Sequence, residues 1–98
     1  MGEAVPFPNQ TPRDFNKYTI EELGAGQIGC YGLLRKNTWI YIGRGDLRDR
    51  LLDHVNGDNA CISRERPTHY VTAITKDAEA WEATLIRELN PICNRRVG

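Results

Sequence analysis

Two short apolar runs joined by a polar turn constrain most strongly what this chain can fold into. Residues 28–34 are apolar and aromatic and contain two glycines, residues 39–42 are Trp-Ile-Tyr-Ile, and Arg-Lys-Asn-Thr lies between them. Short apolar runs bounded by turn residues are typical of β-strands, so the pair predicts a β-hairpin. At 98 residues the chain has room for one modest core, and we therefore expect a single domain.

Three further elements follow the hairpin. Apolar positions at helical spacing predict a helix before and a helix after a third strand, and the three elements cover residues 47–55, 69–74 and 78–89. Asp46 can cap the first helix, and Asn90-Pro91 ends the second. Because the third strand returns after a helical crossover, the predicted class is α/β (α+β), with a small three-stranded mixed sheet flanked by helices.

The N-terminal part has a different composition. Residues 1–17 are rich in proline, asparagine and other polar residues, which favours an extended arm. Thr19 and Glu22 have the spacing of a capping box, so a short helix is expected to begin at Thr19. The predicted division is an arm with a short helix over residues 1–26 and the domain proper over residues 27–98.

Charge and hydropathy exclude several classes of protein. Thirteen Lys and Arg balance thirteen Asp and Glu, which argues against coating nucleic acid or anionic lipid by bulk charge, although a local basic face remains open. No apolar run approaches 18 residues and no signal peptide is evident, so we expect no membrane association and a cytoplasmic location. The cysteines at positions 30, 61 and 93 are odd in number and widely spaced, which predicts reduced thiols.

The last predicted helix has a carboxylate on the face that is expected to pack against the core. Glu82 lies in the middle of an apolar stripe whose other members are Ala78, Trp81, Leu85, Ile86 and Leu89. A carboxylate buried there without a partner costs several kcal/mol. The pattern alone favours an ordinary explanation, either an ion pair with a nearby arginine or a helix with one edge in contact with water. The other explanation is a metal ligand.

Two further pairs admit an ordinary and a functional interpretation. Arg50 and His54 are four residues apart and project together, either as surface arginine and satisfied histidine or as an anion site. Tyr31 and Tyr41 are ordinary strand residues taken singly, but each lies close to a glycine on the predicted hairpin, which permits close approach of a ligand or backbone.

These residues resemble the GIY-YIG nuclease domain family, over residues 28–95. The matching segments, in order, are GCY at 29–31, YIG at 41–43, GRGDLRDRLLDH at 43–54 and WEATLIRELNPICN at 81–94. Arg50 matches the family's phosphate-binding arginine, and His54 a histidine of some restriction-type members. Glu82 matches the metal-binding glutamate and Asn94 an asparagine near the end. The resemblance implies the family's small fold in a stand-alone, single-domain member.

The resemblance also implies a function. It indicates a divalent-metal-dependent endonuclease that hydrolyses DNA phosphodiester bonds with one Mg²⁺ or Mn²⁺ ion held by Glu82. Arg50 would neutralise the phosphate, and Tyr31 would orient or deprotonate water once Arg44, Arg50, the metal or His54 lowers its pKa. Tyr41 would hydrogen-bond the phosphate or the water, and Asn94 would touch the phosphate or hold the backbone. His54 completes the expected catalytic set.

The nucleic acid itself is less defined. Arginines expected to contact phosphates are Arg44, Arg48, Arg64, Arg66, Arg95 and Arg96. Arg44 stands where some family members have a lysine, and Cys30 replaces an isoleucine of the first motif. Whether the DNA is duplex or single-stranded stays open, as does the oligomeric state.

Two other hypotheses remain. One is a nucleic-acid-binding module of the same fold without catalysis. The other is a zinc-stabilised interaction domain with His54, Cys61 and His69 as ligands, although their spacing matches no common structural zinc pattern.

Overall fold

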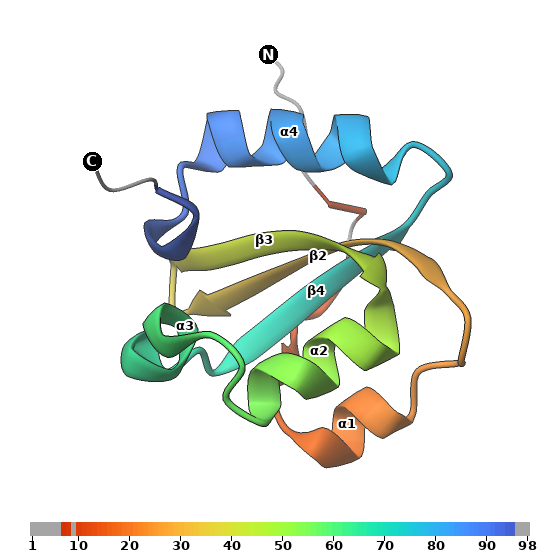
Figure 1. The fold of residues 1–98 in the computed structure, drawn as a ribbon, viewed down its shortest axis with the longest axis horizontal. Coiled ribbons are helices and arrows are strands. Elements are labelled where there is room, and N and C mark those ends of the chain that lie inside the picture. Colours follow the sequence, from red (N-terminus) through yellow and green to blue (C-terminus); the bar gives the residue numbers. More distant parts are fainter. Residues whose placement is uncertain (1–6, 9, 96–98) are drawn as a thin grey trace.

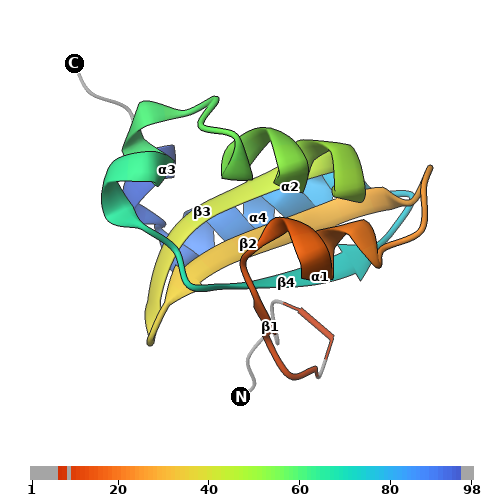
Figure 2. The same cartoon turned by 90° about the horizontal axis from the view of Figure 1, so that it is seen from below.

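The computed structural model describes residues 7, 8 and 10–95. Figures 1 and 2 show α4 over one face of a sheet and α1, α2 and α3 over the other. The elements, in chain order, are β1 (Arg13–Asp14), α1 (Lys17–Glu21), β2 (Ile28–Arg35), β3 (Thr38–Asp46), α2 (Leu47–Val55), α3 (Ala60–Glu65), β4 (His69–Ile74), α4 (Ala78–Leu89) and the 3-10 helix η1 (Ile92–Asn94).

The predicted fold class and the hairpin of β2 and β3 are confirmed, but the sheet differs in two respects. It has four strands in the order β1-β4-β2-β3, and every neighbouring pair is antiparallel, so the sheet is not mixed. β3 and β4 do run in the same direction after the crossover. Because β2 lies between them, however, no parallel pair forms. β1 escaped prediction because two residues are too short to show an alternating pattern.

The described part of the arm packs on the sheet. Phe7 is buried and stacks on Trp39, with ring centroids 5.6 Å apart. The Gln10 side chain satisfies both backbone groups of Thr72: its Oε1 accepts from the amide at 3.0 Å and its Nε2 donates to the carbonyl at 2.8 Å. The arm therefore covers the outer edge of β4, and β1 continues the same pairing.

The start of α1 was predicted two residues too late. The cap is Asn16, whose Oδ1 accepts a hydrogen bond from the Thr19 amide at 3.0 Å. Thr19 instead lies within the helix, and its hydroxyl donates to the Asp14 carbonyl at 2.5 Å. Asparagine is as good a cap as threonine, so the capping-box spacing pointed to the wrong residue.

The sheet divides the core into two layers. Tyr31, Leu33 and Tyr70 belong to the layer under α1, α2 and α3, whereas Cys30 and Val71 belong to the layer under α4. Adjacent residues of a strand point to opposite faces, so Cys30 and Tyr31 belong to different layers.

The apolar stripe of α4 is narrower than predicted. Ala78 and Leu85 are buried, but Trp81 is 39% exposed because it lies at the margin of the stripe. α4 is also the longest helix at 12 residues. Within the described part of the chain, no helix combines the length and apolar composition needed to cross a bilayer.

The prediction of three reduced thiols is wrong. Cys61 and Cys93 form a disulfide that joins α3 to η1, and Cys30 is free and buried. The pairing depends on the fold, which brings together two cysteines 32 positions apart, and spacing alone gives no signal for that. Burial raises the pKa of the Cys30 thiol to about 11, so this remaining thiol is poorly reactive.

We expect the Cys61→Ser/Cys93→Ser variant to unfold more easily than the wild type. A cross-link that closes a loop of this length stabilises a domain by roughly 3–4 kcal/mol through its effect on the unfolded chain. Urea unfolding without reductant measures the difference. Reductant should destabilise the wild type and leave the double variant unchanged. Three titratable thiols in denatured, unreduced wild-type protein would contradict the disulfide.

Candidate active site

Asn94 secures the exposed edge of β3. β3 is the outer strand of the sheet, so one side of its backbone has no strand neighbour among the residues that the structure describes. The Asn94 Oδ1 accepts from the Ile42 amide at 2.7 Å, and its Nδ2 donates to the Ile42 carbonyl at 2.9 Å. One side-chain amide thus takes the place of one residue of a further strand. Of the two roles left open for Asn94, the structure shows it holding the backbone, between Tyr41 and Gly43.

Tyr31 reaches the same place from β2. It pairs with Gly43, and a Cβ built on that glycine would overlap the Tyr31 hydroxyl and press on the Tyr41 ring. Only glycine leaves room for the Tyr31 ring to cross β3 at this point. The ring centroids of Tyr31 and Tyr41 lie 6.3 Å apart.

The Tyr31 hydroxyl meets a histidine of α2. Its oxygen lies 2.7 Å from His54 Nε2, and both side chains are buried. The His54 ring also packs edge-on to Tyr41, with centroids 5.2 Å apart. On its other side, His54 Nδ1 lies 2.7 Å from the Asp58 carboxylate. His54 of α2 therefore contacts three side chains, which come from β2, β3 and the loop after α2.

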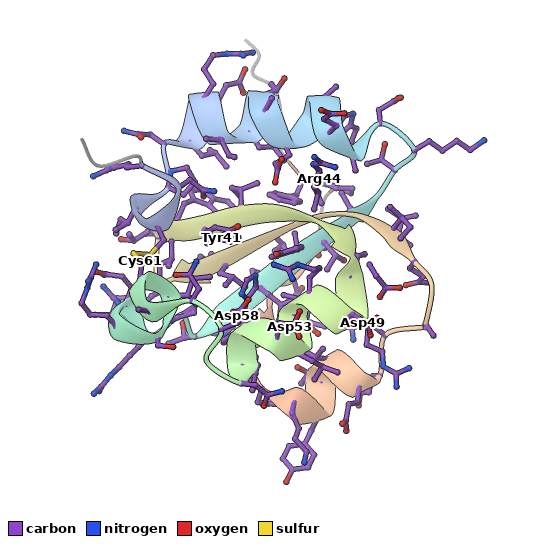
Figure 3. The ribbon with its side chains drawn as sticks, viewed as in Figure 1. Tyr41, Arg44, Asp49, Asp53, Asp58 and Cys61 are labelled. Carbon is purple, nitrogen blue, oxygen red and sulfur yellow. A yellow bond between two sulfur atoms is a disulfide. The ribbon has the colours of Figure 1, made fainter. Side chains whose placement is uncertain are left out.

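Arg50 lies one turn before His54 on α2. Its guanidinium bonds Asp53 at 3.0 Å and lies 3.9 Å from Asp58, and its side chain is 40% exposed. Figure 3 shows Asp53 and Asp58 beside α2, with Tyr41 and Arg44 along β3. An arginine placed at such a margin retains donors that can turn toward an anion.

The pKa of the Tyr31 hydroxyl is set mainly by burial. Burial raises the pKa of Tyr31 well above its usual range, and the neighbouring Tyr41 adds to the rise. The charge and hydrogen bond of Arg50 lower it, but they do not offset the loss of solvation. Arg50 therefore lowers the pKa of Tyr31 as expected, but burial outweighs its effect. Burial also raises the pKa of Tyr41, with Glu82 the next contributor.

Glu82 belongs to the opposite side of β3. Its side chain is 24% exposed, and its Oε1 accepts a hydrogen bond from Arg44 Nε at 3.1 Å. This ion pair accounts for a carboxylate within the apolar stripe of α4. Among the described residues, no three His, Cys, Asp or Glu side chains gather as a metal cluster. The carboxylate of Glu82 is the kind of oxygen ligand that Mg²⁺ prefers, and Mg²⁺ commonly binds one or two carboxylates while it keeps several of its waters.

The proposed zinc set does not fit the structure. Cys61 is in a disulfide, and both ring nitrogens of His54 are engaged by Tyr31 and Asp58. His69 instead lies between Thr68 and Asp14, at 2.9 and 3.3 Å. The zinc hypothesis is accordingly set aside.

The arginines expected to bind nucleic acid come from two regions. Arg44 and Arg48 flank the junction of β3 and α2. Arg64 and Arg66 lie in and just after α3, and Arg95 follows η1, which the disulfide joins to α3. Arg95 also donates to Asn90 at 3.3 Å. Arg96 lies outside the described residues.

Sequence reasoning missed Asp58. The signal was present, because Asp58 follows His54 by four residues, the spacing of neighbours on one helix face. Asn56 and Gly57 obscured this signal, because an Asn-Gly pair is a typical helix end and α2 ends at Val55, before Asp58 is reached. The contact forms because the chain turns back at Gly57, whose φ is +89°.

This chain matches known proteins by its structure rather than by its sequence. No family model matches this chain, and no curated protein matches its sequence. The GIY-YIG N-terminal endonuclease domain of UvrC from Thermotoga maritima, in a crystal structure with its catalytic magnesium, matches with a TM-score of 0.68. The identity is 27%, over 79% of this chain and 97% of that chain.

Point mutants of that domain from the same organism, also with the divalent cation bound, give the same result. A tyrosine-to-phenylalanine mutant is 28% identical over 80% of this chain and 97% of that chain, with a TM-score of 0.68. An asparagine-to-alanine mutant is 26% identical over the same shares, again with a TM-score of 0.68. With almost the whole of the solved domain covered, this chain is a GIY-YIG-like domain.

Proposed function

We propose that this chain is a divalent-metal-dependent endonuclease that hydrolyses phosphodiester bonds of DNA. The observation that carries the proposal is the Tyr31 hydroxyl, held 2.7 Å from a histidine nitrogen in the buried space beside Arg50. A hydroxyl with a proton acceptor at one side and a guanidinium at the other is suited to activating water next to a phosphate. The structural match to a magnesium-bound endonuclease domain supports the same activity.

Tyr31 acts on the attacking water. Because burial disfavours the phenolate, Tyr31 is poorly suited to stand alone as an ionised base. It can instead give its own proton to His54 while it takes one from the water. The phenol is then neutral before and after the step, and the net change is one proton moved from water to His54 Nε2.

Arg50 and Tyr41 act on the phosphate. The partly exposed guanidinium of Arg50 can exchange its contact with Asp53 for a bidentate contact with phosphate oxygens, where negative charge grows during attack. Tyr41 is half-buried on the edge strand and can donate its hydroxyl hydrogen to the same group. The arginines at the β3–α2 junction and near η1 would contact neighbouring phosphates.

Glu82 would hold the metal. A Mg²⁺ or Mn²⁺ ion bound there supplies Lewis-acid stabilisation of the leaving oxygen. Arg44 bonds Oε1 of that carboxylate, so its positive charge would compete with a cation. The alternative function, a binding module without catalysis, draws support from this same ion pair, because the positive charge of Arg44 beside Glu82 opposes the binding of a cation there.

The Glu82→Gln variant is expected to lose cleavage and keep its fold. Several kcal/mol of charge stabilisation correspond to a fall in rate of roughly a thousandfold. The assay uses supercoiled plasmid, linear duplex and single-stranded DNA with Mg²⁺, Mn²⁺ or EDTA, and EDTA should abolish cutting. Glu79→Gln, exposed on the first turn of the same helix, is the matched control. Normal cutting by Glu82→Gln would refute the metal assignment, and no cutting by folded wild type would favour the binding module.

The Arg44→Gln variant is expected to bind metal more tightly. An exposed ion pair contributes about 0.2–1 kcal/mol, so its removal should raise Mn²⁺ affinity by up to about fivefold. Titration followed by the electron paramagnetic resonance of free Mn²⁺ measures this without DNA. Arg48→Gln, a neighbouring change of the same charge, serves as the control. Unchanged or weaker binding by Arg44→Gln would show that Arg44 does not compete for Glu82.

A further inference from the structure

We infer that Asp58 is a positioning residue, which holds His54 in the one tautomer able to accept the Tyr31 proton. The inference rests on the proposed function for its role in cleavage, but the tautomer itself is a property of the protein alone. Tyr31, His54 and Asp58 form a continuous line, with 2.7 Å from the Tyr31 oxygen to Nε2 and 2.7 Å from Nδ1 to the carboxylate.

The chemistry of the three groups assigns the hydrogens. An ionised carboxylate can only accept hydrogen bonds, so the bond to Asp58 requires a hydrogen on His54 Nδ1. In neutral imidazole the other nitrogen then carries the lone pair. Nε2 must therefore accept, and the Tyr31 hydroxyl donates to it. Without Asp58, His54 could carry its hydrogen on Nε2, and Tyr31 would have no acceptor for its proton.

Backbone hydrogen bonds hold Asp58 in place. After α2, the Gly57 amide donates to the His54 carbonyl at 3.1 Å, and the Asp58 amide donates to the Asp53 carbonyl at 3.2 Å. These bonds close the turn that carries Asp58 back to the His54 ring. The His54 side chain is 1% exposed and the Asp58 side chain is 35% exposed. A buried ring that contacts a partly solvated carboxylate can take up a proton without leaving an unpaired charge in the core.

Charged and titratable groups from β2, β3 and α2 form or adjoin this line. Tyr31 comes from β2 and Tyr41 from β3, and Arg50 and Asp53 come from α2. Arg50 complicates a simple test, because it lies 3.9 Å from Asp58 and removal of Asp58 also removes one of its partners. Asp53 offers the matched control, because it binds Arg50 more closely, at 3.0 Å, and has no bond to the His54 ring.

The first experiment is nitrogen-15 NMR of the imidazoles in the free protein. The chain has two histidines, and a His69→Gln variant assigns the spectrum. At a pH where His54 is neutral, the wild type and Asp53→Ala should show the hydrogen on Nδ1. Asp58→Ala should shift His54 toward the Nε2-protonated form. A wild type protonated on Nε2, or an unchanged tautomer in Asp58→Ala, would overturn the inference.

The second experiment measures cleavage by the same variants. A positioned general base contributes about 10²–10⁴ in rate, so Asp58→Ala should lower kcat at least about a hundredfold with KM little changed. The kcat of Asp53→Ala should stay within about threefold of the wild-type value, because Asp53 does not bond the general base His54. Equal losses in both variants would assign the effect to Arg50 and overturn the positioning role. If wild type cuts no DNA, the proposed function fails, and the NMR result alone decides the tautomer.

Discussion

The pairing of Tyr31 with Gly43 is the contact on which the rest of the site depends. It places a large ring across a residue without a side chain, so the hydroxyl passes over β3 and reaches α2. A shift of the hairpin register by one residue would turn Tyr31 toward α4 and Cys30 toward α2. The same register puts Tyr41 within 6.3 Å of Tyr31, measured between ring centroids. One pairing thus brings three strand and helix elements to a common point.

The edge of the sheet is closed by the C-terminal segment rather than by another strand. Asn94 bonds both backbone groups of Ile42, next to Tyr41 and Gly43, and the adjacent Cys93 is linked to Cys61 of α3. An unpaired edge strand is prone to bind other chains or to fray. Asn94 ties η1 to β3, the strand that carries YIG at 41–43, and the disulfide ties η1 to α3, so the same short helix serves both stability and site geometry.

The sequence was sufficient for most features with a local signal, and the exception is the start of α1, where Asn16 rather than Thr19 caps the helix. The hairpin, α2 and α4, and the anomaly of Glu82 in an apolar stripe all follow from periodicity and turn residues, and the structure confirms the fold class. What failed depends on tertiary contacts: the two residues of β1, the disulfide between Cys61 and Cys93, and the contact of Asp58 with His54 after a glycine turn. The burial of Tyr31, which outweighs the lowering of its pKa by Arg50, is likewise a tertiary effect that no local pattern indicates.

The two sides of β3 offer opposite environments. On the α2 side, Tyr31 and His54 are buried, and dry surroundings make ionisation of a lone phenol unfavourable. On the α4 side, Arg44 is 46% exposed and Glu82 remains a partly hydrated ion pair. Proton relay through neutral groups suits the first environment, and a water-rich cation suits the second. In the proposed mechanism the edge strand therefore separates activation of water from stabilisation of the leaving oxygen, and the phosphate has to lie across β3 to meet both.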